Sequence, residues 1–154
     1  MYMQKLHQTI QINAPREKVW DTMLNLETYE QWTKPFNPAG STYIGNWEQG
    51  SEIRFIGVSD NPAEGDSGMY SRIKENRLHE YISIEHVGMI MNGQIDTTSE
   101  EVKKWVPAFE NYTLTDKDGG TEVSVDMDIQ EEYKDDFDKM WPEALLKLKE
   151  ICER

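Results

Sequence analysis

The C-terminal segment carries the pattern that most limits how this chain can fold. Its apolar residues recur every three or four positions, as on one stripe of a helix: Tyr133, Phe137, Met140, Trp141, Ala144, Leu145, Leu148, Ile151 and Cys152. Pro142 lies inside this stripe, and because proline lacks an amide donor we expect a kink or a fresh helix start there. A helix with one apolar stripe needs an apolar surface to cover.

The segments before this helix alternate apolar and polar residues with the period of a β-strand. We expect strands at residues 3–12, around 43–44, and at 52–58, 69–74, 81–87, 111–115 and 122–129. Two short helices should follow the first strand, one starting at Asn13-Ala14-Pro15 and one from Glu27 to Trp32. Thr98 and Glu101 have the spacing of a capping box and predict a further short helix, which Pro107 ends.

These expected elements fit together in one way. Each strand has a single apolar face, so the sheet needs covering on one side, and the helix stripe is the surface available for it. The sequence therefore predicts an α+β fold, in which a curved antiparallel sheet of about six to seven strands wraps around a long C-terminal helix. Two short helices follow the first strand, and we expect one domain over residues 1–154.

Charge and residue content narrow the possible partners. The net charge is −13, from 29 acidic and 16 basic residues, so we expect no nucleic acid partner, because phosphates would be repelled. No apolar run approaches the roughly 18 residues that cross a bilayer, so no membrane insertion is expected. Cys152 is the single cysteine, which indicates a reducing, cytoplasmic location. No histidine or cysteine has metal-ligand spacing and no nucleotide loop occurs, so no metal or cofactor is expected.

Several motifs are similar to a known group of proteins. The opening, Ala14-Pro15-x-x-Lys18-Val19-Trp20 followed by Tyr29-x-x-Trp32, resembles the START-like (Bet v 1-like, SRPBCC) superfamily. Three later stretches resemble its bacterial branch related to the Hsp90 ATPase activator homologue 1 (AHSA1-like) proteins: Ser99–Trp105, Glu110–Thr113 and Trp141–Lys149. The resemblance covers essentially the whole chain and implies a single START-like domain with the helix-grip fold, which holds a cavity between the sheet and the long helix.

The resemblance also implies a range of functions. Members bind lipids, sterols, polyketides or other apolar molecules, and a few are cyclases, dehydratases or hydrolases. We therefore expect binding of a small apolar or amphipathic molecule, with an enzyme of the cyclase or hydrolase type as one alternative. Activation of an Hsp90-type chaperone is the other, ranked lower because the eukaryotic activators carry an additional N-terminal domain and this sequence begins at the first strand. A monomer and a homodimer are both compatible with the sequence.

Large apolar side chains on the inward faces should line the cavity. Trp32 and Phe36 follow the second short helix, near the expected mouth, and we expect Trp105 to act as a lid. The complete expected lining is Trp32, Phe36, Phe55, Met69, Ile84, His86, Met89, Met91, Trp105, Tyr112, Met127, Met140 and Trp141.

Two side chains are weak candidates for acid–base chemistry, and we assign no catalytic residue. His86 is expected on the same strand face as Ile82 and Ile84, and Glu110 on the same strand face as Tyr112, two positions later. The competing interpretation is that His86 only hydrogen-bonds a neighbour and that Glu110 lies at the wet end of its strand.

Overall fold

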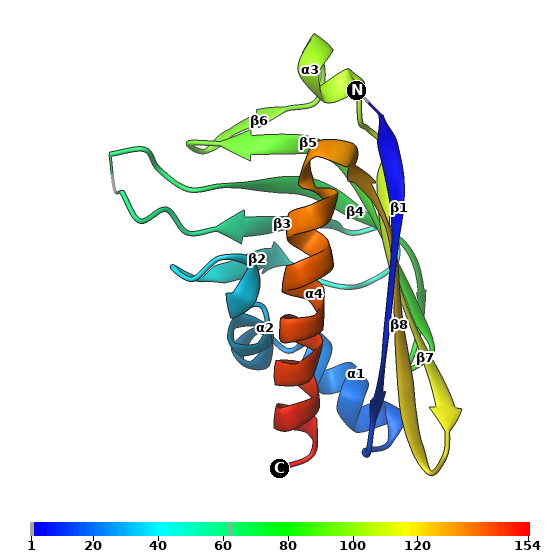
Figure 1. Cartoon of the computed structure of the whole chain (residues 1–154). Helices are drawn as coiled ribbons and strands as arrows, with labels where there is room; N and C mark the ends of the chain where they lie inside the picture. The colour runs from blue at the N-terminus through cyan, green and yellow to red at the C-terminus, as the bar shows by residue number, and fades with distance from the viewer. Residues whose placement is uncertain (1, 62) are drawn as a thin grey trace.

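The computed structural model describes residues 2–61 and 63–154 (Figure 1). Its elements, in chain order, are β1 (Met3–Ile12), α1 (Arg16–Leu24), α2 (Leu26–Trp32), the 3-10 turn η1 (Lys34–Phe36), β2 (Ser41–Gly45), β3 (Glu52–Gly57), β4 (Ser67–Arg77), β5 (Tyr81–Met91), β6 (Gln94–Asp96), α3 (Glu100–Lys103), β7 (Ala108–Lys117), β8 (Gly120–Gln130) and α4 (Glu131–Cys152).

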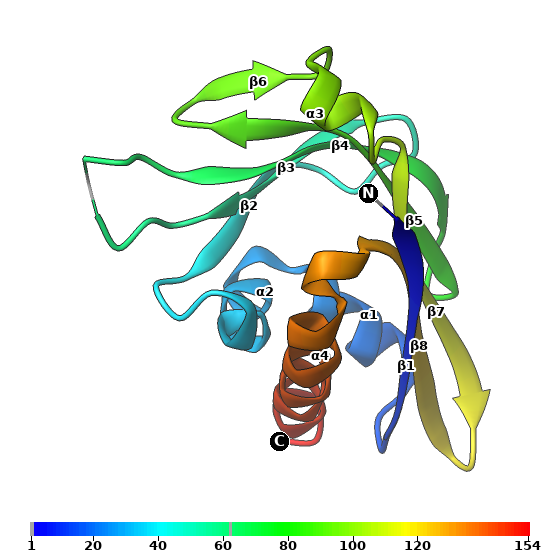
Figure 2. The ribbon, with the colours of Figure 1, turned by 45° about the horizontal axis from the view of Figure 1, so that its top comes forward.

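One antiparallel sheet forms the frame of the molecule. Its strands follow the order β1-β8-β7-β5-β4-β3-β2, and β6 adds to β5 beside this path. Figures 1 and 2 show that the sheet curves around α4, with α1 and α2 on the same concave side. The helix-grip fold expected from the sequence is therefore confirmed.

The apolar stripe of α4 faces this curved sheet. Trp141, Leu145, Leu148 and Cys152 are buried on it, and α4 contacts β1, α1 and α2. The helix continues through Pro142 as one element, so the expectation of a fresh start there is wrong. Pro142 is on the exposed side of the helix, where water can satisfy the carbonyl that its missing amide would have bonded.

Hydrogen bonds to the last two carbonyls of α1 fix three aromatic side chains. The Trp32 indole nitrogen donates to the carbonyl of Met23 at 3.1 Å. The carbonyl of Leu24, the last residue of α1, accepts from the Tyr43 hydroxyl at 2.5 Å and from the Trp47 indole at 3.1 Å. These bonds satisfy carbonyls that a helix end leaves free and hold α1 and α2 against β2.

Three local expectations differ from the structure. Pro15 occupies the N-cap of α1 and not the first helical position. Ser99, not Thr98, caps α3, because its hydroxyl accepts from the Val102 amide at 3.2 Å. The short helix ends at Lys103, before Trp105. None of the helices in residues 2–61 and 63–154 is long and apolar enough to cross a membrane.

Candidate functional site: an apolar cavity with one polar cluster

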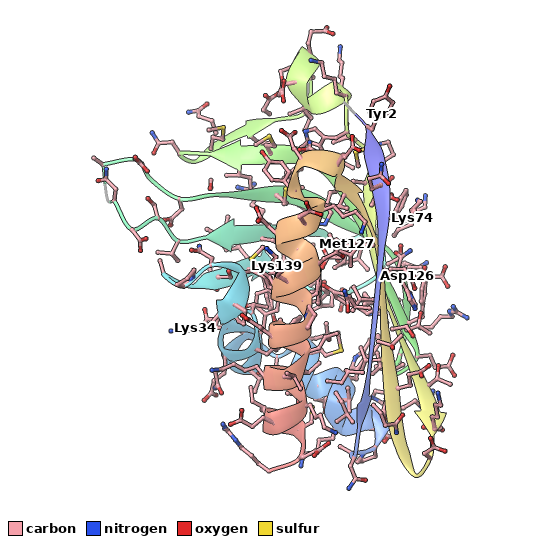
Figure 3. All side chains as sticks on the ribbon, viewed as in Figure 1. Tyr2, Lys34, Lys74, Asp126, Met127 and Lys139 are labelled. Atoms are coloured by element: carbon pink, nitrogen blue, oxygen red, sulfur yellow. The ribbon has the colours of Figure 1, made fainter. Side chains whose placement is uncertain are left out.

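A cavity of about 550 Å³ lies between the concave face of the sheet and the N-terminal half of α4. Side chains from β3, β4, β5, β7 and β8 form one wall. The other wall comes from α2, η1 and α4, which contribute Trp32, Phe36 and Trp141. Figure 3 shows the two faces of β8: Met127 lies between the sheet and α4, and Asp126 is on the opposite side of the sheet.

Aromatic rings in mutual contact build the helical wall. The ring centroids of Phe36 and Trp141 are 4.8 Å apart in an edge-to-face arrangement. Trp32 lies 6.1 Å from Trp141 and 5.8 Å from Tyr29. Offset and edge-to-face pairs of this kind add stability beyond the burial of the rings. The wall is therefore held in one arrangement by ring packing and by the Trp32 hydrogen bond to α1.

Cross-strand pairing aligns the residues on the sheet wall. Phe55 pairs with Met69, and Met69 pairs with Met89, which makes one row across β3, β4 and β5. His86 lies three positions from Met89, so regular alternation would place the two on opposite faces. A register shift between β4 and β5 at Tyr70/Ser71 absorbs the extra residue, as a β-bulge does, and both side chains line the cavity.

A polar cluster interrupts this apolar wall. The Nε2 atom of His86 lies 3.0 Å from a carboxylate oxygen of Glu110, and its Nδ1 atom lies 2.7 Å from the Ser71 hydroxyl. The Tyr112 hydroxyl donates to the second carboxylate oxygen of Glu110. The side chains of His86 and Glu110 are 7% and 18% exposed, so the cluster is largely shielded from bulk water. The competing interpretation of His86 agrees with the structure, because the ring is hydrogen-bonded to its neighbours. The one for Glu110 does not, because its side chain lines the cavity and is largely shielded.

The Glu110 carboxylate influences two phenols of the cavity wall. Burial raises the pKa of Tyr112 well above its usual value, and the charge and hydrogen bond of Glu110 add to this. Burial likewise raises the pKa of Tyr29, with further contributions from the charge of Glu110 and from Tyr43. Both phenols therefore stay protonated at neutral pH and are available as hydrogen-bond donors.

Ser71, His86 and Glu110 are residue types found in nucleophilic triads, but their arrangement suits another role. Ser71 is only 1% exposed and is not among the residues that line the cavity. A nucleophilic serine needs access to the substrate. Its hydroxyl instead holds the imidazole ring in place, and the carboxylate is the group of the three that the cavity exposes most. This arrangement does not favour a nucleophilic role for Ser71.

The family of the chain follows from a comparison with protein-family models. Residues 13–153 match the family described as "Activator of Hsp90 ATPase homolog 1-like protein". The chain belongs to this family. No curated protein matches it.

Solved structures with the same fold come from several bacteria. Protein MLL2253 of Mesorhizobium loti is 15% identical with a TM-score of 0.70, and 98% of each chain is covered. Protein Ms6760 of Mycobacterium smegmatis is 15% identical with a TM-score of 0.72, covering 96% of this chain and 89% of the other. The Aha1 dimer of Colwellia psychrerythraea is 15% identical with a TM-score of 0.69, covering 97% and 96%. At these identities the likeness concerns the fold.

Ten of the thirteen residues expected to line the cavity do so: Trp32, Phe36, Phe55, Met69, His86, Met89, Trp105, Tyr112, Met127 and Trp141. Three do not. Ile84 is 1% exposed and belongs to the core beneath the cavity, and Met91 is 60% exposed at the end of β5. Met140 is half-buried on α4 and is not a lining residue. Trp105 packs with Val102 and Ala108 at the edge of the cavity, and its role as a lid stays a prediction.

Several lining residues were not expected from the sequence. Tyr29 and Phe137 had a sequence indication, because each lies one helical turn from an expected residue, Trp32 and Trp141 respectively. Met3 had no such indication, because it is three positions from the buried Leu6 and regular alternation places the two on opposite faces of β1. The remaining unexpected residues are mostly polar or small side chains around the cavity: Thr33, Asn37, Ser41, Ile56, Gly57, Ser67, Gly68, Glu101, Ala108, Asp128, Ile129, Gln130 and Tyr133.

Proposed function

We propose that this protein binds a small apolar or amphipathic molecule in the cavity between the sheet and α4. The observation that carries the proposal is the cavity itself, about 550 Å³ in volume and lined by aromatic and methionine side chains. Sites for small molecules in proteins have this size and this mainly apolar lining with a few polar groups. A cytoplasmic setting is part of the proposal, in keeping with the single cysteine, the buried free thiol of Cys152.

The wall chemistry supports a guest that is largely apolar. Met69, Met89 and Met127 project flexible thioether chains into the space, and such side chains adapt to guests of different shape. Trp32, Phe36 and Trp141 provide flat apolar surface opposite them. A guest held between the two walls would be removed from water on both faces, which is the main source of binding free energy for apolar molecules.

Titration with N-phenyl-1-naphthylamine, a neutral probe that fluoresces in apolar surroundings, tests this function. We expect a saturable rise in fluorescence with one probe bound per chain. Met69→Gln keeps the side chain length but makes the wall polar, and it should weaken binding about tenfold.

Met91→Gln is the matched control. Met91 lies on the strand that pairs with β4, but it is exposed and outside the cavity, so this variant should bind like the original protein. Absence of saturable binding, or equal loss of affinity in the two variants, would argue against a cavity ligand.

The family supplies a second candidate function. The matched model bears the name of an activator of the Hsp90 ATPase and covers residues 13–153, and one structural neighbour is described as an Aha1 dimer. We propose stimulation of an Hsp90-type chaperone as the alternative to ligand binding. It predicts a concentration-dependent rise in the ATPase rate of the chaperone on addition of this protein, and an unchanged rate at high molar excess would remove it.

A further inference from the structure

The charged groups on the cavity wall are almost all of one sign. The lining residues that the structure describes include the carboxylates of Glu101, Glu110 and Asp128 but no lysine or arginine, and His86 is the one basic side chain among them. Asp128 already pairs with Lys5 and accepts from the Phe109 amide. Glu101 is 65% exposed and lies 3.9 Å from the Lys104 ammonium. Glu110 is therefore the shielded carboxylate on the cavity wall.

Neither hydrogen bond of His86 requires a second proton on its ring. Its Nε2 atom faces Glu110 and its Nδ1 atom faces the Ser71 hydroxyl. A neutral ring that donates from Nε2 and accepts the serine proton at Nδ1 satisfies both bonds without a second proton. With a neutral ring the pair carries a net charge of −1, and Tyr112 donates to the other carboxylate oxygen.

Aromatic rings pack against the two residues that hydrogen-bond this carboxylate, His86 and Tyr112. The Phe55 ring centroid lies 6.0 Å from that of His86, and the Tyr112 ring lies 6.0 Å from that of Trp141. The faces of such rings carry partial negative charge and attract cations within about 6 Å. A carboxylate beside several aromatic rings, with water largely excluded, is an environment that favours an ammonium group over an anion.

We propose that the guest of the cavity is an amphipathic cation, an alkyl or aryl amine that is protonated at neutral pH. The inference rests on the proposed binding function and names the ligand class. The ammonium group lies against Glu110, and the apolar part extends along Met69, Met89 and the aromatic wall of α4. A fatty acid is disfavoured, because its carboxylate would meet Glu110 where the described lining offers no lysine or arginine, in a protein of net charge −13.

Three ligands with the same decyl chain test the proposal: decylamine, decanol and decanoate. Their affinities for the full chain are measured by calorimetry at pH 7, in phosphate buffer and below the micelle concentrations. We expect decylamine to bind about tenfold more tightly than decanol, with decanoate the weakest, because a charge-assisted hydrogen bond contributes on this scale. Added salt should weaken the binding of the amine more than that of the alcohol.

Glu110→Gln should remove the preference for the amine and leave the affinity for decanol in place. Glu143→Gln changes the charge equally at an exposed position of α4 and should keep the original order. Tightest binding of decanol or decanoate overturns the inference while the proposed function stands. Failure of all three ligands to bind overturns both. If Glu110→Gln does not fold, the order of affinities for the unaltered protein decides by itself.

Discussion

The phenol of Tyr112 is bound to the Glu110 carboxylate inside the apolar wall. Burial and the neighbouring charge raise the pKa of this tyrosine well above 10.0. In the unfolded chain the phenol ionises near pH 10, whereas in the folded protein it keeps its proton. The stability that it contributes is complete below about pH 10 and is lost as the pH rises toward the folded pKa.

A Tyr112→Phe variant should therefore lose stability less steeply in alkali. We expect the slope of unfolding free energy against pH to be shallower by about 1 kcal/mol per pH unit between about pH 10 and pH 11, and by up to about 1.4 kcal/mol per pH unit at higher pH. Urea denaturation at stepped pH measures both slopes. Tyr2→Phe is the control, because Tyr2 is 75% exposed, and its slope should match that of the original protein. Equal slopes for all three proteins would mean that the Tyr112 phenol has no special environment.

Sequence reasoning found His86 and Glu110 because both lie on strands with clear alternation. It did not find Ser71 or Tyr29 as their neighbours. Ser71 comes opposite His86 only through the β4–β5 register, which contains a shift, and Tyr29 approaches Glu110 from a helix far away in sequence. Contacts that depend on register and on helix placement are not encoded in local periodicity.

At the scale of elements, α4 holds the molecule together through a few buried side chains. Leu148 is 0% exposed on the stripe that faces the sheet, and Leu146 is 60% exposed on the same helix. Leu148→Ala should lower the free energy of unfolding by about 2–5 kcal/mol, because it removes buried methyl groups and leaves a cavity. Leu146→Ala should change it by no more than about 0.5 kcal/mol. Urea denaturation compares the two variants, and similar losses would contradict the assigned orientation of α4.

The N-cap of α3 is a different residue in the structure from the one expected from the sequence. Ser99 accepts from the Val102 amide, whereas the capping box predicted Thr98 in this role. Ser99→Ala should cost about 1 kcal/mol in unfolding free energy, the usual value of a lost N-cap, and Thr98→Ala should cost less than about 0.5 kcal/mol. A larger loss for Thr98→Ala would restore the capping-box assignment.

Strand alternation and the helix stripe were sufficient to predict most elements, but not their bounds. β4 runs on to Arg77, beyond the end expected at residue 74, and the turn that follows it contains His79 with a φ of 66°. β6, at three residues, is too short to show a period of its own. Strand ends are set by pairing with distant segments, and local pattern does not report this.

At the scale of the whole molecule, the cavity depends on how the sheet curves over one end of α4. Leu145, Leu148 and Cys152 fill the space near the C-terminal end of α4, while the N-terminal half leaves the cavity open beside Phe137 and Trp141. The sequence pattern predicted a curved sheet around one helix, and the resemblance to START-like proteins implied a cavity between them. The sequence did not show which apolar residues fill the core and which line the cavity, because the same residue types do both. Ile84, Met91 and Met140 were expected to line the cavity and do not.

The methionine methyl groups give the most direct test of a ligand in this cavity. Met3, Met69, Met89 and Met127 line it, whereas Met23, Met91 and Met140 do not. With ¹³C-labelled methionine methyls, titration with decanol followed by NMR should shift the four lining resonances saturably and together. The resonances of Met23, Met91 and Met140 should stay in place. No saturable shift, or shifts confined to Met91 and Met140, would contradict the account.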